Sequence, residues 1–270
     1  MKGRQQRESM KRHDGETRAF SLIELLVVIG IIAAVSVISV PVMRGLGQSN
    51  VMTSGTQQLV DDLMLARHKA MVGRTTVHVV FVPEWINEKP PGGLSTREQR
   101  VWDRVRGGAF TMYALYAERT LGDQPGKRND RYITDWRTLP EGVFITKDEY
   151  EDLPANRFDN EPPIDRPFAR ADFPFPTQQS PVKRELPHIA FDQNGSLLQY
   201  KKSGNRARVY QPEYIWMAKG SVLVARDGDN VSIDAREVPL FNSISNYNRI
   251  RIDPVSGRAR LERPEINLGN

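Results

Sequence analysis

The sequence predicts an α+β fold in which one long N-terminal α-helix packs on a domain of antiparallel β-sheet. Three observations lead to this prediction. No residue from Leu25 to Val42 carries a charge, and a helical repeat of apolar residues follows as far as about Met71. Beyond Gly73, short runs of β-branched and aromatic residues alternate with turn sequences, as is typical of antiparallel sheets.

The first part of the predicted helix is long enough to cross a lipid bilayer. The eighteen residues Leu25–Val42 would span about 27 Å as a helix, close to the thickness of the hydrocarbon layer. A plain membrane anchor or a cleaved secretory signal peptide would explain this length. Neither explains Glu24, because a carboxylate in lipid costs about 2.5–3.5 kcal/mol at the bilayer centre and somewhat less near its edge. The apolar segment also begins abruptly at Phe20, after a polar and basic stretch.

The residues at this border, Ala19-Phe20-Ser21-Leu22-Ile23-Glu24-Leu25, resemble the processing site of type IV pilins and type II secretion pseudopilins. The resemblance implies that a prepilin peptidase cleaves between Ala19 and Phe20 and N-methylates Phe20. Glu24 then stands fifth in the mature chain, where the family has an acidic residue, and Pro41 stands at the family's proline position. Ala19 departs from the usual glycine, but alanine is also small, so we expect processing to continue at a lower rate.

Four later stretches resemble the minor pseudopilin H and FimT class. They are the pattern L-x-x-D-L-x-x-A-R-x-x-A at Leu59–Ala70, the segment Trp136–Val143, the turn at Ile189–Ser196 and the final hairpin at Ile250–Leu261. The resemblance implies a pilin-like fold and a structural subunit of a type II secretion pseudopilus, not an enzyme. A type IV pilus minor pilin, and a membrane-anchored periplasmic binding protein that does not polymerise, remain the alternatives.

This interpretation gives the chain four parts. We expect a leader peptide at 1–19, a transmembrane and assembly half-helix at 20–43, a soluble amphipathic half-helix at 44–73, and a periplasmic β-rich domain at 74–270 with insertions near 83–108 and 147–187. In the soluble half-helix, one face is predicted to pack on the sheet. Its residues are Met52, Leu59, Leu63, Ala66 and Ala70, whereas Asp61, Asp62, Arg67 and Lys69 lie off it.

The strand pattern of the β-rich domain follows from alternation and turn residues. We expect strands at 75–82, 109–117, 143–146, 188–191, 196–201, 214–217, 222–225, 249–252 and 258–261. Asn194-Gly195 supplies the positive φ of a tight turn, and a longer turn follows at Asp253–Gly257. A short helix is expected near Ser95–Val105. The proline-rich segment 147–187 is predicted to form an exposed loop, because proline lacks the donor that a sheet needs.

Charge and composition exclude several classes of protein. The net charge is +5, of which the leader supplies +3, so the basic balance reflects membrane orientation and gives poor evidence for nucleic-acid binding. The leader is expected to stay cytoplasmic, with the β-rich domain in the periplasm and the chain in the inner membrane. The chain has no cysteine, and so no disulfide or cysteine metal site.

No catalytic or metal site is expected. The four histidines, His13, His68, His78 and His188, lack metal-ligand spacing. The acidic turn Asp227–Asn230 has calcium-loop chemistry but lacks a downstream bidentate Glu, so an ordinary turn is the favoured interpretation. We therefore expect no catalytic residue, metal, cofactor, nucleic acid or small-molecule substrate. The expected partners are the prepilin peptidase, other pilin-like subunits and the inner membrane.

Overall fold

A computed structural model describes residues 22–82, 90–124, 126–146, 168–199, 208, 210–227, 230–242 and 248–263, without the side chains of residues 34–50, 226, 227, 230 and 231. The chain divides into two compact units, residues 1–47 and residues 48–270. The fold is α+β, with a helix packed on antiparallel sheets, as the sequence predicts.

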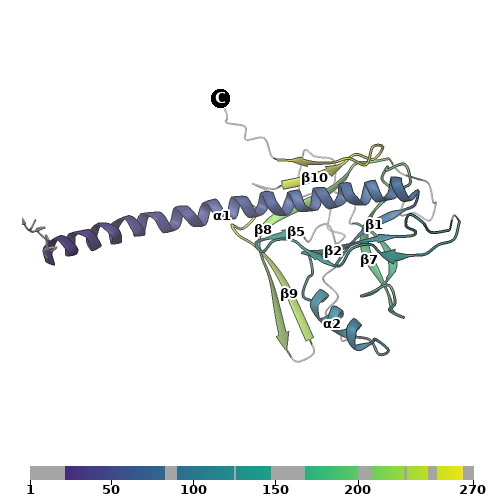
Figure 1. Ribbon diagram of the computed structural model, residues 1–270, viewed down its shortest axis with the longest axis horizontal. Coiled ribbons are helices and arrows are strands. Elements are labelled where there is room, and N and C mark those ends of the chain that lie inside the picture. The colour runs from purple at the N-terminus through teal and green to yellow at the C-terminus, as the bar shows by residue number, and fades with distance from the viewer. Residues whose placement is uncertain are drawn as a thin grey trace, which may run out of the picture. The chain divides into compact units, whose positions relative to one another are not determined.

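The principal helix, α1, is described from Leu22 to Gly73, and it ends close to the C-terminal limit predicted from the sequence. In the second unit it buries the face that the apolar repeat predicts, since Leu59, Leu63, Ala66 and Ala70 have no solvent-exposed surface. Figure 1 shows this part of α1 running across strands of both sheets, and the same apolar cluster contains residues from α1 and from both sheets.

The first sheet has the strand order β3-β2-β1-β7-β6, and β4 also pairs with β2. Its strands are β1 (Val77–Phe81), β2 (Met112–Ala117), β3 (Arg131–Tyr132), β4 (Arg137–Thr138), β6 (Ala169–Pro174) and β7 (Lys183–Phe191). All the pairings are antiparallel.

The second sheet has the order β11-β10-β8-β5, and β9 also pairs with β8. Its strands are β5 (Val143–Ile145), β8 (Glu213–Asp227), β9 (Asn230–Glu237), β10 (Asn248–Ile252) and β11 (Ala259–Glu262). The strand β8 is long enough to pair with β10 along its first residues and with β9 along its last ones.

The central strands of the first sheet, β1 and β2, are buried on both faces of the sheet. Alternate side chains of a strand point to opposite faces, so each strand contributes to two apolar clusters. In β1, Val77, Val79 and Phe81 join the cluster beneath α1, whereas Val80 joins a second cluster on the other face. Trp102 of α2 (Thr96–Val105) belongs to the second cluster.

The predicted helix near Ser95–Val105 is confirmed. The Ser95 hydroxyl accepts a hydrogen bond from the Glu98 backbone N–H, and the Glu98 carboxylate accepts one from the Ser95 N–H. This reciprocal capping explains why α2 begins at Thr96.

Two glycine turns meet beside the last turns of α1. Gly195 and Gly257 have φ values of 77° and 62°, which favour glycine. A Cβ atom on Gly257 would overlap the carbonyl oxygen of Gly195, and a Cβ on Gly195 would lie 2.8 Å from the sulfur of Met71. The predicted positive φ at Asn194-Gly195 is therefore confirmed, and the tertiary contact adds a steric reason for glycine at both positions.

The prediction of an exposed loop over 147–187 is wrong for its described part, residues 168–187. This part contains β6 and most of β7, and it buries Phe173, Phe175 and Leu186. Two of its prolines stand where the missing backbone N–H does not break a strand pairing. Pro174 is the last residue of β6, and Pro187 precedes His188, the first residue of β7 that pairs with β1. Residues 147–167 lie outside the described part of the chain.

The strand predictions after residue 195 need three corrections. The segments 214–217 and 222–225 belong to one strand, β8, whose second half pairs with β9. The strand β9 was not predicted, although Val231, Ile233 and Ala235 alternate there with polar residues. The strand expected at 196–201 is only an isolated bridge between Phe191 and Leu197, so far as residues 196–199 are described.

Replacing Gly257 by Ala should lower the free energy of unfolding by about 2–5 kcal/mol, because the methyl group adds steric overlap with Gly195 to the strain of a positive φ. Urea unfolding of the full-length protein in nonionic detergent, followed by tryptophan fluorescence, would measure this change. Gly122→Ala is the matched control, since Gly122 has a φ of 93° with open space around it, and should cost about 1–2 kcal/mol. Equal losses in the two variants would contradict the predicted contact between the turns.

Candidate functional site

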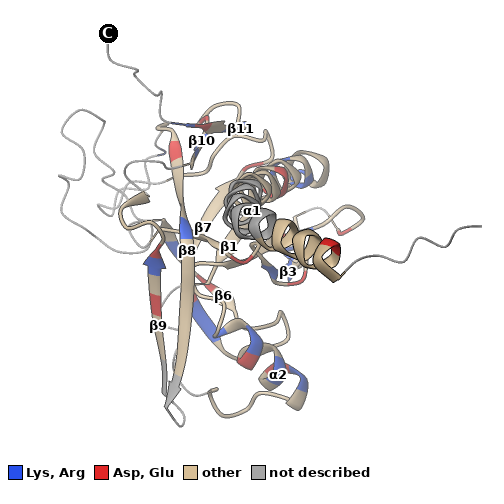
Figure 2. Cartoon of the chain, turned by 90° about the vertical axis from the view of Figure 1, so that its left-hand side faces the viewer, with Lys and Arg blue, Asp and Glu red and all other residues tan. Residues whose placement is uncertain are grey.

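The first turns of α1 present apolar side chains on all sides. Nine large apolar residues in this stretch are between 45% and 83% exposed: Leu22, Ile23, Leu25, Leu26, Val27, Val28, Ile29, Ile31 and Ile32. Figure 2 shows these turns in tan with a single acidic band. A helix that is apolar all round needs an apolar environment, either lipid or other protein surfaces.

The predicted assembly residues lie on this helix, and the predicted cleavage residues precede it. Glu24 is in the first turn of α1 and is exposed. Pro41 lies within the helical span, but its side chain is outside the description, and Ala19 and Phe20 lie outside the described residues.

Judged on the described residues alone, none of the helices combines the length and the apolar character that a membrane crossing requires.

The second half of α1 carries a buried polar network that was not predicted from the sequence. Asp62 was expected to lie off the buried face, and this expectation is wrong, because Asp62 is buried. Its carboxylate accepts hydrogen bonds from the Tyr113 hydroxyl at 2.6 Å and from the Arg137 guanidinium, with which it also forms an ion pair. Burial, and the hydrogen bond to Asp62, raise the pKa of Tyr113 well above its usual range, so its hydroxyl remains a donor.

Further polar contacts fix the same half of α1 to both sheets. The Gln58 amide donates to the Tyr113 hydroxyl at 3.1 Å and to the carbonyl of Thr138 at 3.0 Å. Nearer the end of α1, Arg67 donates to the carbonyl of Ser256 at 2.6 Å. Together with the buried apolar face, these contacts bring the D-L-x-x-A-R motif, the Trp136–Val143 segment and the last hairpin into one assembly around α1.

Two histidines meet on the face of the first sheet that points away from α1. The rings of His78 and His188 have centroids 5.0 Å apart, and both rings contact Phe173. Burial, and then repulsion from His78, lower the pKa of His188 to about 3.

No group of three or more potential metal ligands occurs within the described residues. The acidic turn Asp227–Asn230 lies outside what can be tested, because Gly228, Asp229 and the neighbouring side chains are not described.

Two features of α1 therefore stand out among the described residues. One half of α1 offers apolar surface, and the other half is fixed to a sheet domain by its buried face and polar contacts. Comparisons with protein-family models, with curated proteins and with solved structures found no match.

Arg137→Ala should lower the free energy of unfolding by about 1–3 kcal/mol, because it removes the cationic partner of a buried carboxylate. The loss should stay below that of a fully buried pair, since the Arg137 side chain is 39% exposed and water can replace it in part. Urea unfolding of Arg137→Ala, Asp62→Ala and the double variant would measure the coupling, expected at about 0.5–3 kcal/mol.

Lys69→Ala is the control for this double-mutant cycle of Asp62 and Arg137. Lys69 is exposed on the same helix, so its replacement should change the free energy of unfolding by less than about 0.5 kcal/mol. Strict additivity of Asp62→Ala and Arg137→Ala would show that the two side chains do not interact in solution.

Proposed function

We propose that this chain is a pilin-like filament subunit, and specifically a minor pseudopilin of a type II secretion pseudopilus. Prepilin peptidase cleaves it between Ala19 and Phe20 and methylates Phe20. It is anchored in the inner membrane by the first half of α1, with its sheet domain in the periplasm, and enters a filament with other pilin-like subunits through the same half-helix.

The observation that carries this proposal is the position of Glu24. It is the one charged residue between Phe20 and Val42, and the side chains around it are exposed and apolar. It also follows the cleavage motif at the spacing found in pilins. A passive anchor gains nothing from an acidic residue there, because the carboxylate resists transfer into lipid. The division of α1 into an apolar exposed part and a part fixed to a sheet domain also supports the proposal.

The proposed mechanism uses Glu24 to set the register between subunits. Cleavage gives Phe20 a new α-amino group, which is a cation at the membrane face. When subunits stack, Glu24 of one subunit pairs with the amine of a neighbour. An unpaired carboxylate is penalised in an apolar bundle, so only the correct axial register removes the penalty. The apolar side chains around Glu24 then supply the contacts that hold the bundle together.

Two alternatives share the same anchor. A type IV pilus minor pilin would use the same processing and the same register pair, and differs only in the filament that it joins. A membrane-anchored periplasmic binding protein would use the apolar half-helix without assembling. The role of Glu24 separates assembly from solitary anchoring.

The mature chain should begin at Phe20 with an N-methylated amine, because Ala19, Phe20 and Glu24 satisfy the peptidase motif. Intact-mass and N-terminal peptide mass spectrometry of the membrane-extracted protein would check this. A chain that still begins at Met1, or one that begins near Val40 as after signal-peptide cleavage, would exclude the pilin-like interpretation.

Glu24→Ala should leave processing nearly normal, because the cleaved bond precedes Phe20. Incorporation into filaments should fall by about a hundredfold or more, since breaking a buried pair from one side costs about 3–5 kcal/mol. Processing and co-assembly would be measured separately, by mass spectrometry and by crosslinking of sheared filaments.

Asp61→Ala is the matched control, because it removes an exposed carboxylate from the second half of the same helix. It should assemble like the wild type. Unchanged co-assembly of Glu24→Ala would refute the register role and leave the solitary anchor as the better explanation.

A further inference from the structure

A cavity of about 440 Å³ lies in the sheet domain, where the chain leaves α1 and enters the first sheet. Segments far apart in the sequence line it: the residues after α1, the end of β2, the turn around Gly126 and the turn after β7. Five of its side chains are cationic and only two are anionic. The cationic ones are Arg74, Arg119, Lys127, Arg128 and Arg208.

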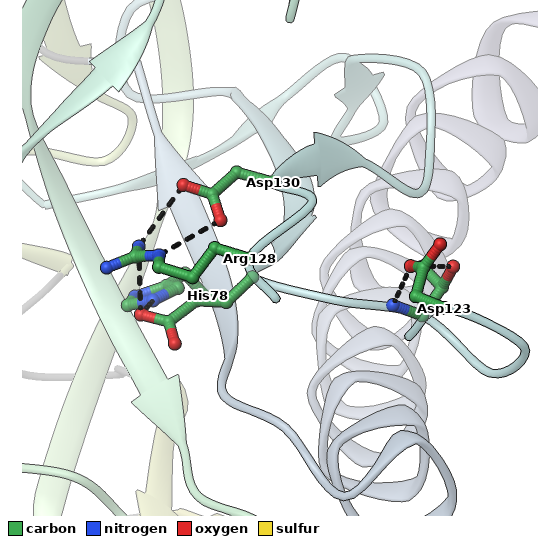
Figure 3. Close-up of polar contacts among 6 residues, drawn as sticks. His78, Asp123, Arg128 and Asp130 are labelled. Atoms are coloured by element: carbon green, nitrogen blue, oxygen red, sulfur yellow. Dashed lines mark hydrogen bonds and ion pairs between the residues drawn. The ribbon is translucent and has the colours of Figure 1, made fainter. Parts of the chain in front are cut away.

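Both carboxylates of the cavity already have arginine partners. Glu118 pairs with Arg128 at 3.2 Å, and Arg128 also pairs with Asp130 at 3.1 Å, as Figure 3 shows. Asp192 pairs with Arg208 at 2.5 Å. The contact with His78, whose Nε2 lies 3.8 Å from the Glu118 carboxylate, and then the charge of Arg128 lower the pKa of Glu118, so this carboxylate stays ionised and paired.

Three cations therefore face the cavity without an acidic partner in the described part of the chain: Arg74, Arg119 and Lys127. Arg119 donates a hydrogen bond to the carbonyl of Arg74 at 2.7 Å, which fixes the direction of its guanidinium group. Like charges around one cavity repel, and a bound anion removes this repulsion while it gains three charge-assisted contacts.

The lining also indicates the class of ligand. Guanidinium groups match carboxylate and phosphate oxygens in geometry, and an ammonium group binds either as a point charge. The remaining lining residues are mostly polar, with hydroxyls from Thr75 and Thr76 and amides from Gln193 and Asn194, and no aromatic side chain is among them. The volume lies within the range of small-molecule sites.

We propose that this cavity binds a small polar ligand with two or more carboxylate or phosphate groups, held by Arg74, Arg119 and Lys127. No small-molecule substrate was expected from the sequence. These cations are scattered along the chain, and only the fold brings them together. The site does not depend on the filament proposal, since none of its residues lies on α1.

The test uses the full-length protein in nonionic detergent at low ionic strength. Isothermal titration calorimetry with citrate and, separately, with pyrophosphate should show saturable binding of one anion per chain, weakened by added sodium chloride. Binding of citrate alone would assign a carboxylate-bearing ligand, and binding of pyrophosphate alone a phosphate-bearing one. Binding of both would support the shared oxyanion chemistry. Absence of binding for both anions would overturn the proposal.

Lys127→Gln and Arg119→Gln should each weaken binding about tenfold, because each removes one of three charge contacts. Lys183→Gln is the matched control, since Lys183 is exposed on β7 and does not line the cavity. Circular dichroism would verify that the variants remain folded. Equal affinity in Lys127→Gln and Lys183→Gln would place any binding elsewhere and overturn the proposed site.

Discussion

The packing of the second half of α1 against the two sheets is the contact on which the rest of the structure depends. Leu59, Leu63, Ala66 and Ala70 contribute to one apolar core with residues from both sheets. Beside the last turns of α1, Gly195 lies so close to the side chains of Met71 and Arg67 that a Cβ atom there would crowd them, and a Cβ on Gly257 would overlap the carbonyl oxygen of Gly195. Without this helix, one face of each sheet would lose its cover, and the free-energy gain of burying that apolar surface would be lost.

The polar contacts along α1 fix the register and rotation of the helix on the sheets. An apolar face alone permits a helix to slide or rotate on a sheet, because dispersion and burial are not directional. Asp62, held by Tyr113 and Arg137, is satisfied in only one register, and Arg67 adds a second fixed point. The same logic underlies the proposed filament contact, in which Glu24 would select one register among apolar neighbours.

The distribution of charge separates two kinds of surface. Around Glu24, a single charge is surrounded by exposed apolar side chains, which suits association with lipid or with other helices. Around the cavity near Arg119, cations outnumber carboxylates and the lining is polar, which suits a hydrated anionic ligand. The first surface is continuous in sequence and the second is not, so only the first can be recognised from a motif.

The sequence by itself determined the features that depend on local chemistry. The end of α1 near Gly73, the position of α2 and the positive φ at Gly195 follow from periodicity and turn residues within a few positions. Tertiary structure decided the rest. Asp62 is buried because its partner, 75 residues away, reaches it. The prolines of β6 and β7 are tolerated because of where the neighbouring strands end, and the cationic cavity exists because distant segments converge. Such pairings depend on long-range contacts, which a local pattern does not encode.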